Sequence, residues 1–375
     1  MKIVFTGGGT GGHFYPIIAI AEKIREIEHE KRLLHPNLYF FAPDPYDERA
    51  LFENDITFEK IPAGKRRTYT SIKNVLDIFT TASGIAKAFV KLFNLYPDII
   101  FAKGGYASFP TLCAARLLQI PVVIHESDTV PGRVNKWAST FAGRIATSYP
   151  QAVKDFPEEK TAHTGHPIRE GLLHPTKKGA YEFLELEEDV PVVLILGGSQ
   201  GAAAINKAVL NALPNLIEDF QIIHQTGKKH IEKMKESVSV ELADNPYSHR
   251  YNPFGYLDEL AMRMTAGAAD LVVSRAGSTI FEIATWEVPS LLIPLPVAHG
   301  DHQHKNAFTY ARTGAAEVIE QRNLTDDILA SQIRKILSDP QKQREMSQAA
   351  QEVASRDAAD TIAREIINLV LEYEQ

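Results

Sequence analysis

Cysteine is almost absent from this chain, which contains a single one, Cys113. One cysteine cannot form an internal disulfide, and its scarcity fits a reducing compartment. Long hydrophobic runs are absent too, because no stretch approaches the roughly 18 uninterrupted apolar residues that a membrane-spanning helix needs. The opening residues 1–6 lead directly into glycines and lack the apolar core of a signal peptide. We therefore expect a cytoplasmic protein, which does not exclude a position on a membrane surface.

An excess of positive charge is also missing. The formal net charge is −7 over 375 residues, with 40 Lys and Arg against 47 Asp and Glu. Nucleic-acid-binding proteins usually present a basic surface, so the composition argues against nucleic acid as a partner. Hydrophobic residues make up 44% and charged residues 23%, which is ordinary for a globular protein. The length favours two domains over one.

Short apolar strands alternate with helical patterns through the first half of the chain. A helix is predicted at 15–27, and strands are predicted at 2–5, 38–42, 98–101, 121–125, 144–147 and 162–165. Apolar strands that alternate with helices form parallel sheets with helical crossovers. The pattern therefore predicts an α/β fold with a doubly wound sheet.

The same pattern restarts in the second half. A new buried strand is predicted at 192–196, followed by a glycine turn and a helix from Ala203, with further strands at 221–225, 271–274 and 290–294. Each half of the chain thus begins with a strand, a glycine turn and a helix. This repetition predicts two Rossmann-like domains that face each other across a ligand-binding cleft. We expect the first domain at 1–164 and the second at 165–354.

The last helix, at about 355–375, is amphipathic. Its apolar face contains Ile362, Ile366, Ile367, Val370 and Leu371, at helical spacing. We expect this helix to pack back onto the first domain.

The first glycine turn reads GGGTGGH from Gly7 to His13 and satisfies the dinucleotide fingerprint G-x-G-x-x-G. Such a turn lets the N–H groups of the following helix approach an anion. A nicotinamide site also needs an acid about 20 residues on, and Asp44, just past the second strand, keeps that interpretation open. His13 favours another, because a helix N-terminus disfavours the charged imidazole and leaves it able to accept a proton. A purely structural histidine is the alternative.

Two further motifs follow strands of the first half. In AKGGYASFPT, Gly104 and Gly105 offer backbone donors at the same edge of the sheet. The next strand ends in HESD, and carboxylates at a strand's carboxyl end lie at the ligand crevice of this architecture. Glu126 and Asp128 are therefore candidates to act as a base or to orient His13, and solvated loop acids are the alternative.

The second half carries three motifs. In GGSQGA, Ser199 and neighbouring N–H groups can hold a phosphate, and in SRAGSTIFEIA, Glu282 lies in the first turns of a helix. Its carboxylate can accept two hydrogen bonds from a ribose diol, or merely complement the helix dipole.

The third motif, HGDHQHKNA, contains His299, His302 and His304. These look like metal ligands, but no cysteine and no i,i+4 histidine pair support a closed metal site. Recognition of sugar hydroxyls by Asp301 and Gln303 is the better interpretation.

Taken together, the sequence resembles the MurG family, the UDP-N-acetylglucosamine–N-acetylmuramyl-(pentapeptide) pyrophosphoryl-undecaprenol N-acetylglucosamine transferases of bacterial cell-wall synthesis. The resemblance covers nearly the whole chain and rests on seven motifs in order: GGGTGGH (7–13), KGGY (103–106), IHES (124–127), GHPIR (165–169), GGSQGA (197–202), RAGSTIFE (275–282) and DHQ (301–303). It implies the GT-B architecture and an inverting transfer from UDP-N-acetylglucosamine to the lipid-linked muramyl pentapeptide, lipid I, which gives lipid II.

The resemblance also implies roles for single residues. On the donor side, Arg169 and Ser199 would contact the UDP diphosphate, the backbone at Leu257 the uracil, Glu282 the ribose, and Gln303 the N-acetylglucosamine. On the acceptor side, the diphosphate would face Thr10, Gly11, Gly12, His13, Gly104, Gly105, Tyr106 and Asn135. We expect His13 to be the base, with Glu126 and Asp128 as rivals. No tightly bound cofactor and no protein metal site are expected, which leaves room for a stimulating divalent cation.

Three features depart from the family pattern. Asp128 and His166 stand where the family usually has asparagine, and the 275–282 loop is one residue shorter. The alternatives to a MurG-type transfer are a UDP-N-acetylglucosamine 2-epimerase, a glycolipid synthase of the same fold class, and a UDP-sugar-binding scaffold without activity.

A lipid-linked acceptor requires docking at the membrane, and one segment suits it. Between Ile61 and Lys91, Asp77 is the only acid, and the bases are Lys65, Arg66, Arg67, Lys73, Lys87 and Lys91. The apolar residues Ile72, Val75, Leu76 and Phe79 fall on one helical face. A cationic rim around an apolar face suits an anionic cytoplasmic leaflet, so we expect a peripheral protein on that face of the membrane. An ordinary core-facing helix is the alternative, and other cell-wall synthesis proteins are further candidate partners.

Overall fold

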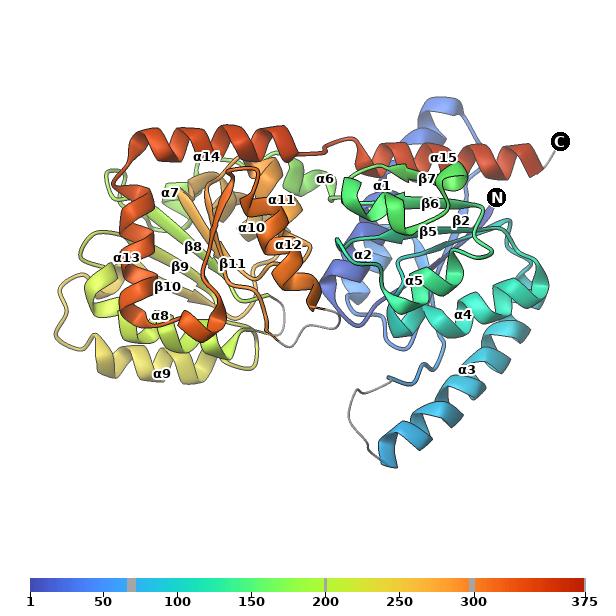
Figure 1. Cartoon of the computed structure of the whole chain (residues 1–375), viewed down its shortest axis with the longest axis horizontal. Helices are drawn as coiled ribbons and strands as arrows, with labels where there is room; N and C mark the ends of the chain where they lie inside the picture. Colours follow the sequence, from blue (N-terminus) through green and yellow to red (C-terminus); the bar gives the residue numbers. More distant parts are fainter. Residues whose placement is uncertain (66–71, 199–200, 297–300, 374–375) are drawn as a thin grey trace. The chain divides into compact units, whose positions relative to one another are not determined.

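The computed structural model of this chain describes residues 1–65, 72–198, 201–296 and 301–373 (Figure 1). The chain divides into two compact units, each with its own parallel sheet. The first unit contains Met1–Arg169 and Ser355–Gln375, and the second contains Glu170–Ala354. Arg169 is thus the last residue of the first unit before the chain enters the second.

Among the described residues, seven strands form the sheet of the first unit, and all neighbouring strands are parallel. Their order across the sheet is β3-β2-β1-β4-β5-β6-β7. Their bounds are Lys2–Thr6 (β1), Asn37–Ala42 (β2), Ile56–Lys60 (β3), Ile99–Ala102 (β4), Val122–Glu126 (β5), Arg144–Thr147 (β6) and Thr161–His163 (β7). The predicted strand at 144–147 is confirmed at the same bounds, whereas β3 was not predicted.

Helices cover both faces of this sheet. One face packs against α1 and α15, and the other against α3, α4 and α5. The helices of this unit are α1 (Gly11–Lys31), α2 (Glu48–Glu53), α3 (Ile72–Leu95), α4 (Gly105–Leu118), α5 (Arg133–Ala138) and α15 (Ala358–Tyr373).

The C-terminal helix α15 belongs to the first unit although nearly two hundred residues separate it from β7 along the chain. It packs along α1 (Figure 1). Ile362, Ile366, Ile367 and Val370 are buried in the same core as Phe14 of α1. The helical spacing of these side chains explains the contact, since it places all four on one face.

Among the described residues, six parallel strands form the second sheet, in the order β10-β9-β8-β11-β12-β13. Their bounds are Val192–Leu196 (β8), Gln221–Gln225 (β9), Tyr251–Phe254 (β10), Leu271–Ser274 (β11), Ser290–Leu292 (β12) and Ala316–Val318 (β13). The predictions for β8, β9 and β11 are confirmed at the same bounds. The edge strands β10 and β13 were not predicted.

Helices again cover both faces. One face packs against α8, α9 and α13, and the opposite face packs against α7, α10 and α11. The helices of this unit are α6 (Glu170–Leu173), α7 (Ala180–Phe183), α8 (Ala203–Leu216), α9 (Ile231–Glu241), α10 (Glu259–Ala268), α11 (Thr279–Trp286), α12 (His302–Ala311), α13 (Asp326–Leu337) and α14 (Pro340–Val353).

Strand order reverses once in each sheet, between β1 and β4 in the first and between β8 and β11 in the second. At such a switch point the two crossovers leave on opposite faces, which opens a crevice at the carboxyl ends of the strands. The motifs GGGTGGH and KGGY follow β1 and β4, while GGSQGA and RAGSTIFE follow β8 and β11. Each pair of motifs therefore meets at a switch point.

Within the described ranges, no helix combines the length and the apolar character that crossing a bilayer requires.

Candidate functional site

The two glycine loops of the first unit lie against each other. A Cβ atom on Gly105 would come within 2.9 Å of the His13 Nδ1 atom, and one on Gly9 within 3.1 Å of the Tyr106 ring. Both glycines have positive φ, +74° and +84°, which other residues rarely adopt. The sequence therefore uses glycine where a side chain would displace His13 or Tyr106, and the two predicted acceptor loops form one surface.

Helix α1 begins within this surface. Thr10 is its N-cap, with an extended backbone, and its hydroxyl makes no capping hydrogen bond. The Thr10 carbonyl accepts hydrogen bonds from the His13 and Phe14 N–H groups, at 3.1 and 3.2 Å. The first N–H groups of the helix, at Gly11 and Gly12, have no side-chain cap, and they sit at the positive end of the helix dipole.

Arg169 lies beside the first turn of α1. Its guanidinium carbon is 3.9 Å from the centre of the Tyr15 ring, in a cation–π contact. The Tyr15 hydroxyl donates to Asp47 Oδ2 at 3.2 Å, and Asp47 caps α2. Stacking pre-organises the guanidinium. The structure thus places a residue predicted for the donor site in the first unit, next to the predicted acceptor loop.

Glu126 organises the loop that follows β5. Its Oε1 accepts the Asp128 N–H at 3.1 Å, and its Oε2 accepts the Gly132 N–H at 2.9 Å and the Asn135 amide at 3.0 Å. The side chain is buried. Burial, followed by repulsion from Asp128, raises the pKa of Glu126, against the three hydrogen bonds that lower it. Both oxygens are engaged, whereas Asp128 lies on the loop that they hold.

Asn135 joins this loop to the second glycine motif. It is buried, and its amide nitrogen also donates to the His125 carbonyl at 3.0 Å. A Cβ atom on Gly104 would lie 2.5 Å from Asn135 Oδ1, and Gly104 has a φ of +80°. Glycine at 104 therefore makes room for Asn135, which brings two predicted acceptor-site residues together.

The residue before this glycine, Lys103, is a buried lysine that sequence reasoning missed. Its side chain is 1% exposed. The ammonium donates to His125 Nδ1 at 2.5 Å and to the Ser127 hydroxyl. Burial lowers the pKa of Lys103 to about 7, although Glu126 and Asp128 nearby act to raise it. Both hydrogen-bond acceptors are neutral groups.

The hydrogen bonds continue beyond His125. Its Nε2 atom lies 3.1 Å from the Gly165 carbonyl and 3.2 Å from the Ser148 hydroxyl, which in turn lies 2.9 Å from His166 Nδ1. Burial and then the charge of Lys103 push the pKa of both histidines well below the usual value. Both rings are therefore neutral. A charged Lys103 can only donate, so the His125 proton lies on Nε2 and points to Gly165.

These contacts connect the carboxyl ends of β4, β5 and β6 with the segment that leads to Arg169. A signal for Lys103 was present in the sequence, as a lysine placed directly after the apolar strand IIFA. No local pattern could show that its ammonium turns inward, because its partners come from β5 and the residues that follow it.

In the second unit, the glycine turn after β8 is held by β9. The Gly197 N–H donates to the Gln225 carbonyl at 3.1 Å, and Gly201, with a φ of +77°, packs so closely on the Thr226 carbonyl that no Cβ fits. Ser199, the predicted phosphate contact, lies outside the described residues. The turn leads directly into α8.

Below this turn lies a second buried polar group. His224 of β9 contacts the Tyr251 hydroxyl at 3.0 Å and Asn206 Oδ1 at 3.2 Å, while the Asn206 amide donates to the Thr226 carbonyl at 3.0 Å. Burial lowers the pKa of His224 to about 3, so this ring is neutral as well. The group fixes the start of α8 against β9.

Leu257, predicted to read uracil through its backbone, is buried after β10. Its N–H donates to the Gln225 side-chain oxygen at 3.0 Å. Gln225 also accepts the Gly197 N–H through its carbonyl, so one residue of β9 holds both the glycine turn and the Leu257 backbone.

Glu282 and Gln303 come from α11 and α12. Glu282 is half-buried in the first turn of α11. The Gln303 carboxamide oxygen accepts the Leu295 N–H at 3.0 Å, which leaves its amide nitrogen as a donor. The Asn306 amide donates to the Ala276 carbonyl at 3.3 Å and so ties α12 to the loop that precedes α11.

Among the described ranges, no three His, Cys, Asp or Glu side chains are grouped to hold a metal ion. His304 instead faces two acids, with Nδ1 3.7 Å from Asp301 and Nε2 3.5 Å from Glu320. His299 lies outside the described residues.

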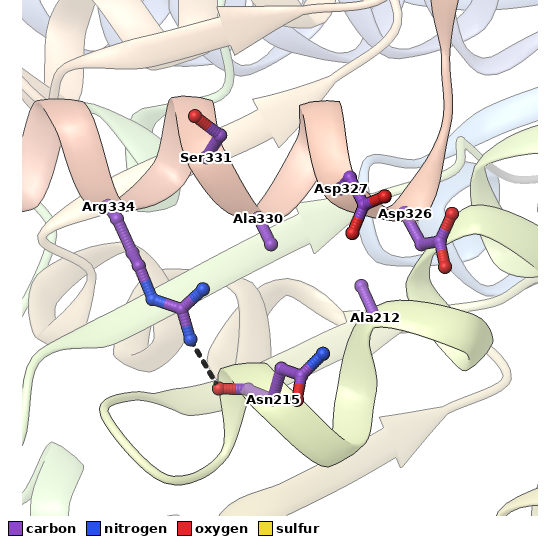
Figure 2. A pocket seen from close by; sticks show the side chains of 7 residues that line it. All are labelled: Ala212, Asn215, Asp326, Asp327, Ala330, Ser331 and Arg334. Carbon is purple, nitrogen blue, oxygen red and sulfur yellow. Dashed lines mark hydrogen bonds between the residues drawn. The ribbon is translucent and has the colours of Figure 1, made fainter.

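A pocket of about 250 Å³ lies away from the strand ends, between α8 and α13 (Figure 2). Arg334 donates to the Asn215 carbonyl at 2.7 Å, and Asp326 and Asp327 line the other end of the pocket (Figure 2). Asn215 is near the end of α8, whereas the glycine turn precedes its start. This pocket is therefore not part of the site built by the motifs.

Helix α3 exposes an apolar stripe along its length. Leu76 is 61% and Phe79 69% exposed. The exposed stripe recurs at alternating spacings of three and four residues and is apolar except for one serine: Leu76, Phe79, Ser83, Ala86, Val90 and Phe93. The opposite side of the helix buries Ala88 and Leu92. Of the predicted patch, Lys65 is also exposed, while Arg66, Arg67 and the side chains of Ile72 and Val75 lie outside what is described.

Comparison with protein families places two domains on the chain. Residues 3–147 match the glycosyltransferase family 28 N-terminal domain, and residues 192–362 match the glycosyltransferase family 28 C-terminal domain. A relative from Clostridium novyi is 34% identical over 380 residues, covering 100% of this chain and 99% of the relative. A relative from Bacillus thuringiensis is 36% identical over 338 residues, covering 89% and 91%. Both relatives are named UDP-N-acetylglucosamine--N-acetylmuramyl-(pentapeptide) pyrophosphoryl-undecaprenol N-acetylglucosamine transferases.

Solved structures show the same similarity in three dimensions. The crystal structure of Acinetobacter baumannii MurG superposes with a TM-score of 0.72 at 27% identity, covering 98% of this chain and 99% of that one. The UDP-GlcNAc 2-epimerase from Neisseria meningitidis bound to UDP-GlcNAc gives 0.69 at 13% identity, covering 99% and 100%. The second similarity is one of fold alone.

The buried ammonium gives a testable stability effect. In the folded chain the pKa of Lys103 is about 7 against an ordinary 10.5, so between these values the unfolded chain binds the extra proton. The contribution of Lys103 to the free energy of unfolding therefore rises with pH across this window, by at most ~1.4 kcal/mol per pH unit. Lys103→Met removes this proton-binding group. We therefore expect the variant to be more stable than wild type at pH 7 and below, with the difference in the free energy of unfolding closing toward pH 10.

Urea unfolding measures this gap. The chain has two tryptophans, Trp137 in the first unit and Trp286 in the second, so a Trp286→Phe background makes the emission report on the first unit. Lys154→Met, at an exposed position of the same unit, is the matched control and should show no pH-dependent gap. A Lys103→Met protein that is less stable than wild type at pH 6 would contradict the assignment.

Proposed function

The chain belongs to the MurG family of N-acetylglucosamine transferases, and we propose that its first unit binds the acceptor and uses His13 as the general base. As a member it moves N-acetylglucosamine from UDP-N-acetylglucosamine to undecaprenyl-pyrophosphoryl-MurNAc-pentapeptide, lipid I, and gives lipid II. The single observation that carries the proposal is the junction of the two glycine loops, where His13 lies against Gly105.

The acceptor diphosphate fits this junction for electrostatic reasons. The uncapped start of α1 and the glycine turn before α4 both direct N–H groups to the carboxyl edge of the sheet, and such groups bind phosphate. Tyr106 and Asn135 border the same loops. We therefore assign Thr10, Gly11, Gly12, Gly104 and Gly105 to phosphate binding, with these two side chains as flanks.

Inversion at the anomeric carbon requires one displacement. In our proposal, His13 takes the proton of the muramyl 4-hydroxyl as that oxygen attacks the sugar, and UDP leaves from the opposite face. General-base assistance contributes roughly 10²- to 10⁴-fold. Stabilising the negative charge that develops on the leaving diphosphate is the larger task, and the stacked guanidinium of Arg169 suits it.

The two carboxylates near His13 receive different roles. Glu126 accepts three hydrogen bonds within its own loop, which supports a positioning role. Asp128 is held by that loop at the edge of the site and is the better candidate to orient the base.

The second unit would bind the donor. The support is the arrangement at its switch point: the GGSQGA turn braced by β9, Leu257 on the same glutamine, Glu282 in the first turn of α11, and Gln303 with a free amide donor. Glu282 can accept both ribose hydroxyls, and the Gln303 amide can donate to the N-acetylglucosamine. No tightly bound cofactor is part of this proposal, and UDP-N-acetylglucosamine is the donor substrate.

His13→Ala is the first test. Loss of the base should lower transfer to a lipid I analogue by about two to four decades while the KM for UDP-N-acetylglucosamine stays unchanged. Steady-state UDP release with and without the analogue measures both quantities. His29→Ala, at an exposed position in the last turn of the same helix, is the control and should be fully active. Normal turnover of the His13 variant, or lost donor binding, would assign the base elsewhere.

Glu282→Ala tests the donor site. A hydrogen bond between a charged and a neutral group contributes roughly 1.5–3 kcal/mol, so the KM for UDP-N-acetylglucosamine should rise roughly tenfold or more. The acceptor KM should not change. Glu241→Ala, an exposed glutamate of the same unit, controls for loss of a negative charge. An unchanged donor KM would show that Glu282 only complements the dipole of α11.

We also propose that the α3 stripe docks on the anionic cytoplasmic leaflet, which makes the protein peripheral. The acceptor is lipid-linked, so its sugar lies just above a bilayer. The stripe is exposed and, apart from Ser83, apolar, with the exposed base Lys87 on the same helix and the exposed base Lys65 in the segment that precedes it. Exposure of Leu76 and Phe79 argues against the alternative of a core-facing helix. An amphipathic surface with cationic flanks binds such membranes.

Vesicle sedimentation tests the docking. Leu76→Ser with Phe79→Ser should abolish binding to phosphatidylglycerol vesicles at low salt, while wild type binds and is released as salt screens the charge. Leu34→Ser with Phe52→Ser makes the same exchange at positions 86% and 83% exposed elsewhere on the first unit, and should bind normally. Wild type that ignores anionic vesicles, or equal loss in both variants, would place docking elsewhere.

A further inference from the structure

We propose that Lys103 is a positioning residue for the transfer: its buried ammonium offsets Glu126 and Asp128, so that the anionic diphosphate of the acceptor can bind beside these acids. The proposal rests on the assignment of the acceptor to the first unit. It adds a buried cation at the start of the KGGY motif that acts through its charge and makes no contact with the substrate.

The position of Lys103 is the first argument. It follows β4, and its N–H donates to the Thr6 carbonyl at the end of β1, at 2.9 Å. A Cβ atom on Gly7 would lie 3.0 Å from the Lys103 Cβ atom. Lys103 also directly precedes Gly104. Lys103 therefore lies where both glycine loops leave the sheet, and its side chain is buried.

The cost of its burial is the second argument. An ammonium removed from water loses favourable hydration, a cost that a well-placed ion pair can offset. Lys103 instead donates to a neutral imidazole and a hydroxyl. An apolar side chain of similar length would fit the same space without that cost. A cation held at such a cost is typical of a functional site, where perturbed groups gather.

The surrounding charges define what the cation does. The titratable groups that interact with Lys103 come from β5 and its loop and from the segment after β7: His125, Glu126, Asp128 and His166. His13 of α1 acts on the same two histidines. His125 and His166 are neutral. The acids are the remaining charged neighbours on β5 and its loop, and by themselves they would repel a diphosphate. In a low-dielectric interior one buried cation cancels much of that repulsion.

A pH effect follows from this balance. Lys103 carries its proton below about pH 7 and loses it above that value. Without the proton, the acids repel the acceptor diphosphate unopposed. Acceptor affinity of the wild type should therefore fall as the pH rises through 7, and the donor site in the second unit should not follow this change.

The experiment compares wild type with Lys103→Met. The acceptor is a short-chain, water-soluble lipid I analogue that keeps its diphosphate, so membrane docking does not enter. At pH 6.5 we expect the acceptor KM of the variant to be roughly tenfold higher or more, with an unchanged donor KM. From pH 6.5 to 9 the wild-type acceptor KM should rise toward the variant's value, whereas the variant's should lack this rise. Lys154→Met is the control and should behave as wild type.

A second variant keeps the charge and changes its support. Ser127→Ala removes one acceptor of the ammonium, which makes the proton easier to lose, so the rise in acceptor KM should begin at a lower pH than in wild type. Inorganic pyrophosphate, as a competitor of the acceptor, should inhibit wild type more strongly than Lys103→Met at pH 6.5.

Other results would overturn the proposal. An acceptor KM of Lys103→Met equal to wild type at pH 6.5 would assign Lys103 a structural role only, as would an unmoved pH profile in Ser127→Ala. If wild type does not transfer N-acetylglucosamine to the analogue at all, the acceptor assignment itself fails. The two failures are therefore distinguishable.

Discussion

Parallel strands deliver all their carboxyl ends to one edge of a sheet, and in each unit of this chain the strand order reverses once at that edge. In the first unit, this constraint brings the loops after β1 and β4 together. The start of α1, the start of α4 and His13 share the space between them. Close approach is possible because Gly9, Gly104 and Gly105 lack side chains where Tyr106, Asn135 and His13 lie. The candidate chemistry of the first unit depends on this approach.

The electrostatics of the site follow from burial at the same edge. Lys103, His125 and Glu126 are turned inward from neighbouring strand ends. Burial keeps both histidines neutral, raises the pKa of Glu126, and lowers the pKa of Lys103. A cluster with few charges results, in which a single proton on Lys103 changes the balance. The second unit has a smaller buried polar group below its glycine turn, in which a neutral His224 is held by Tyr251 and Asn206.

Much of the architecture was predictable because its signals are local. Central strands of a parallel sheet are buried on both faces and appear as short apolar runs, so β6, β8, β9 and β11 were predicted at their observed bounds. The edge strands β10 and β13 mix polar and apolar residues, as in YNPF and AEV, and carry no such signal. The apolar face of α15 was visible in its spacing, and packing onto α1 buries that face. The motifs, and the family resemblance that rests on them, were visible because each motif is a short contiguous stretch of sequence.

The sequence by itself determined which elements form and which residues stand at the strand ends, because periodicity and glycine placement act over a few residues. Only the tertiary structure decided where those side chains turn. It buried Lys103 against His125, engaged both oxygens of Glu126, stacked Arg169 on Tyr15 in the first unit, and left the α3 stripe exposed. Each of these outcomes depends on partners from distant parts of the chain. Burial and hydrogen bonding to such partners set charge and orientation, and no local pattern contains them.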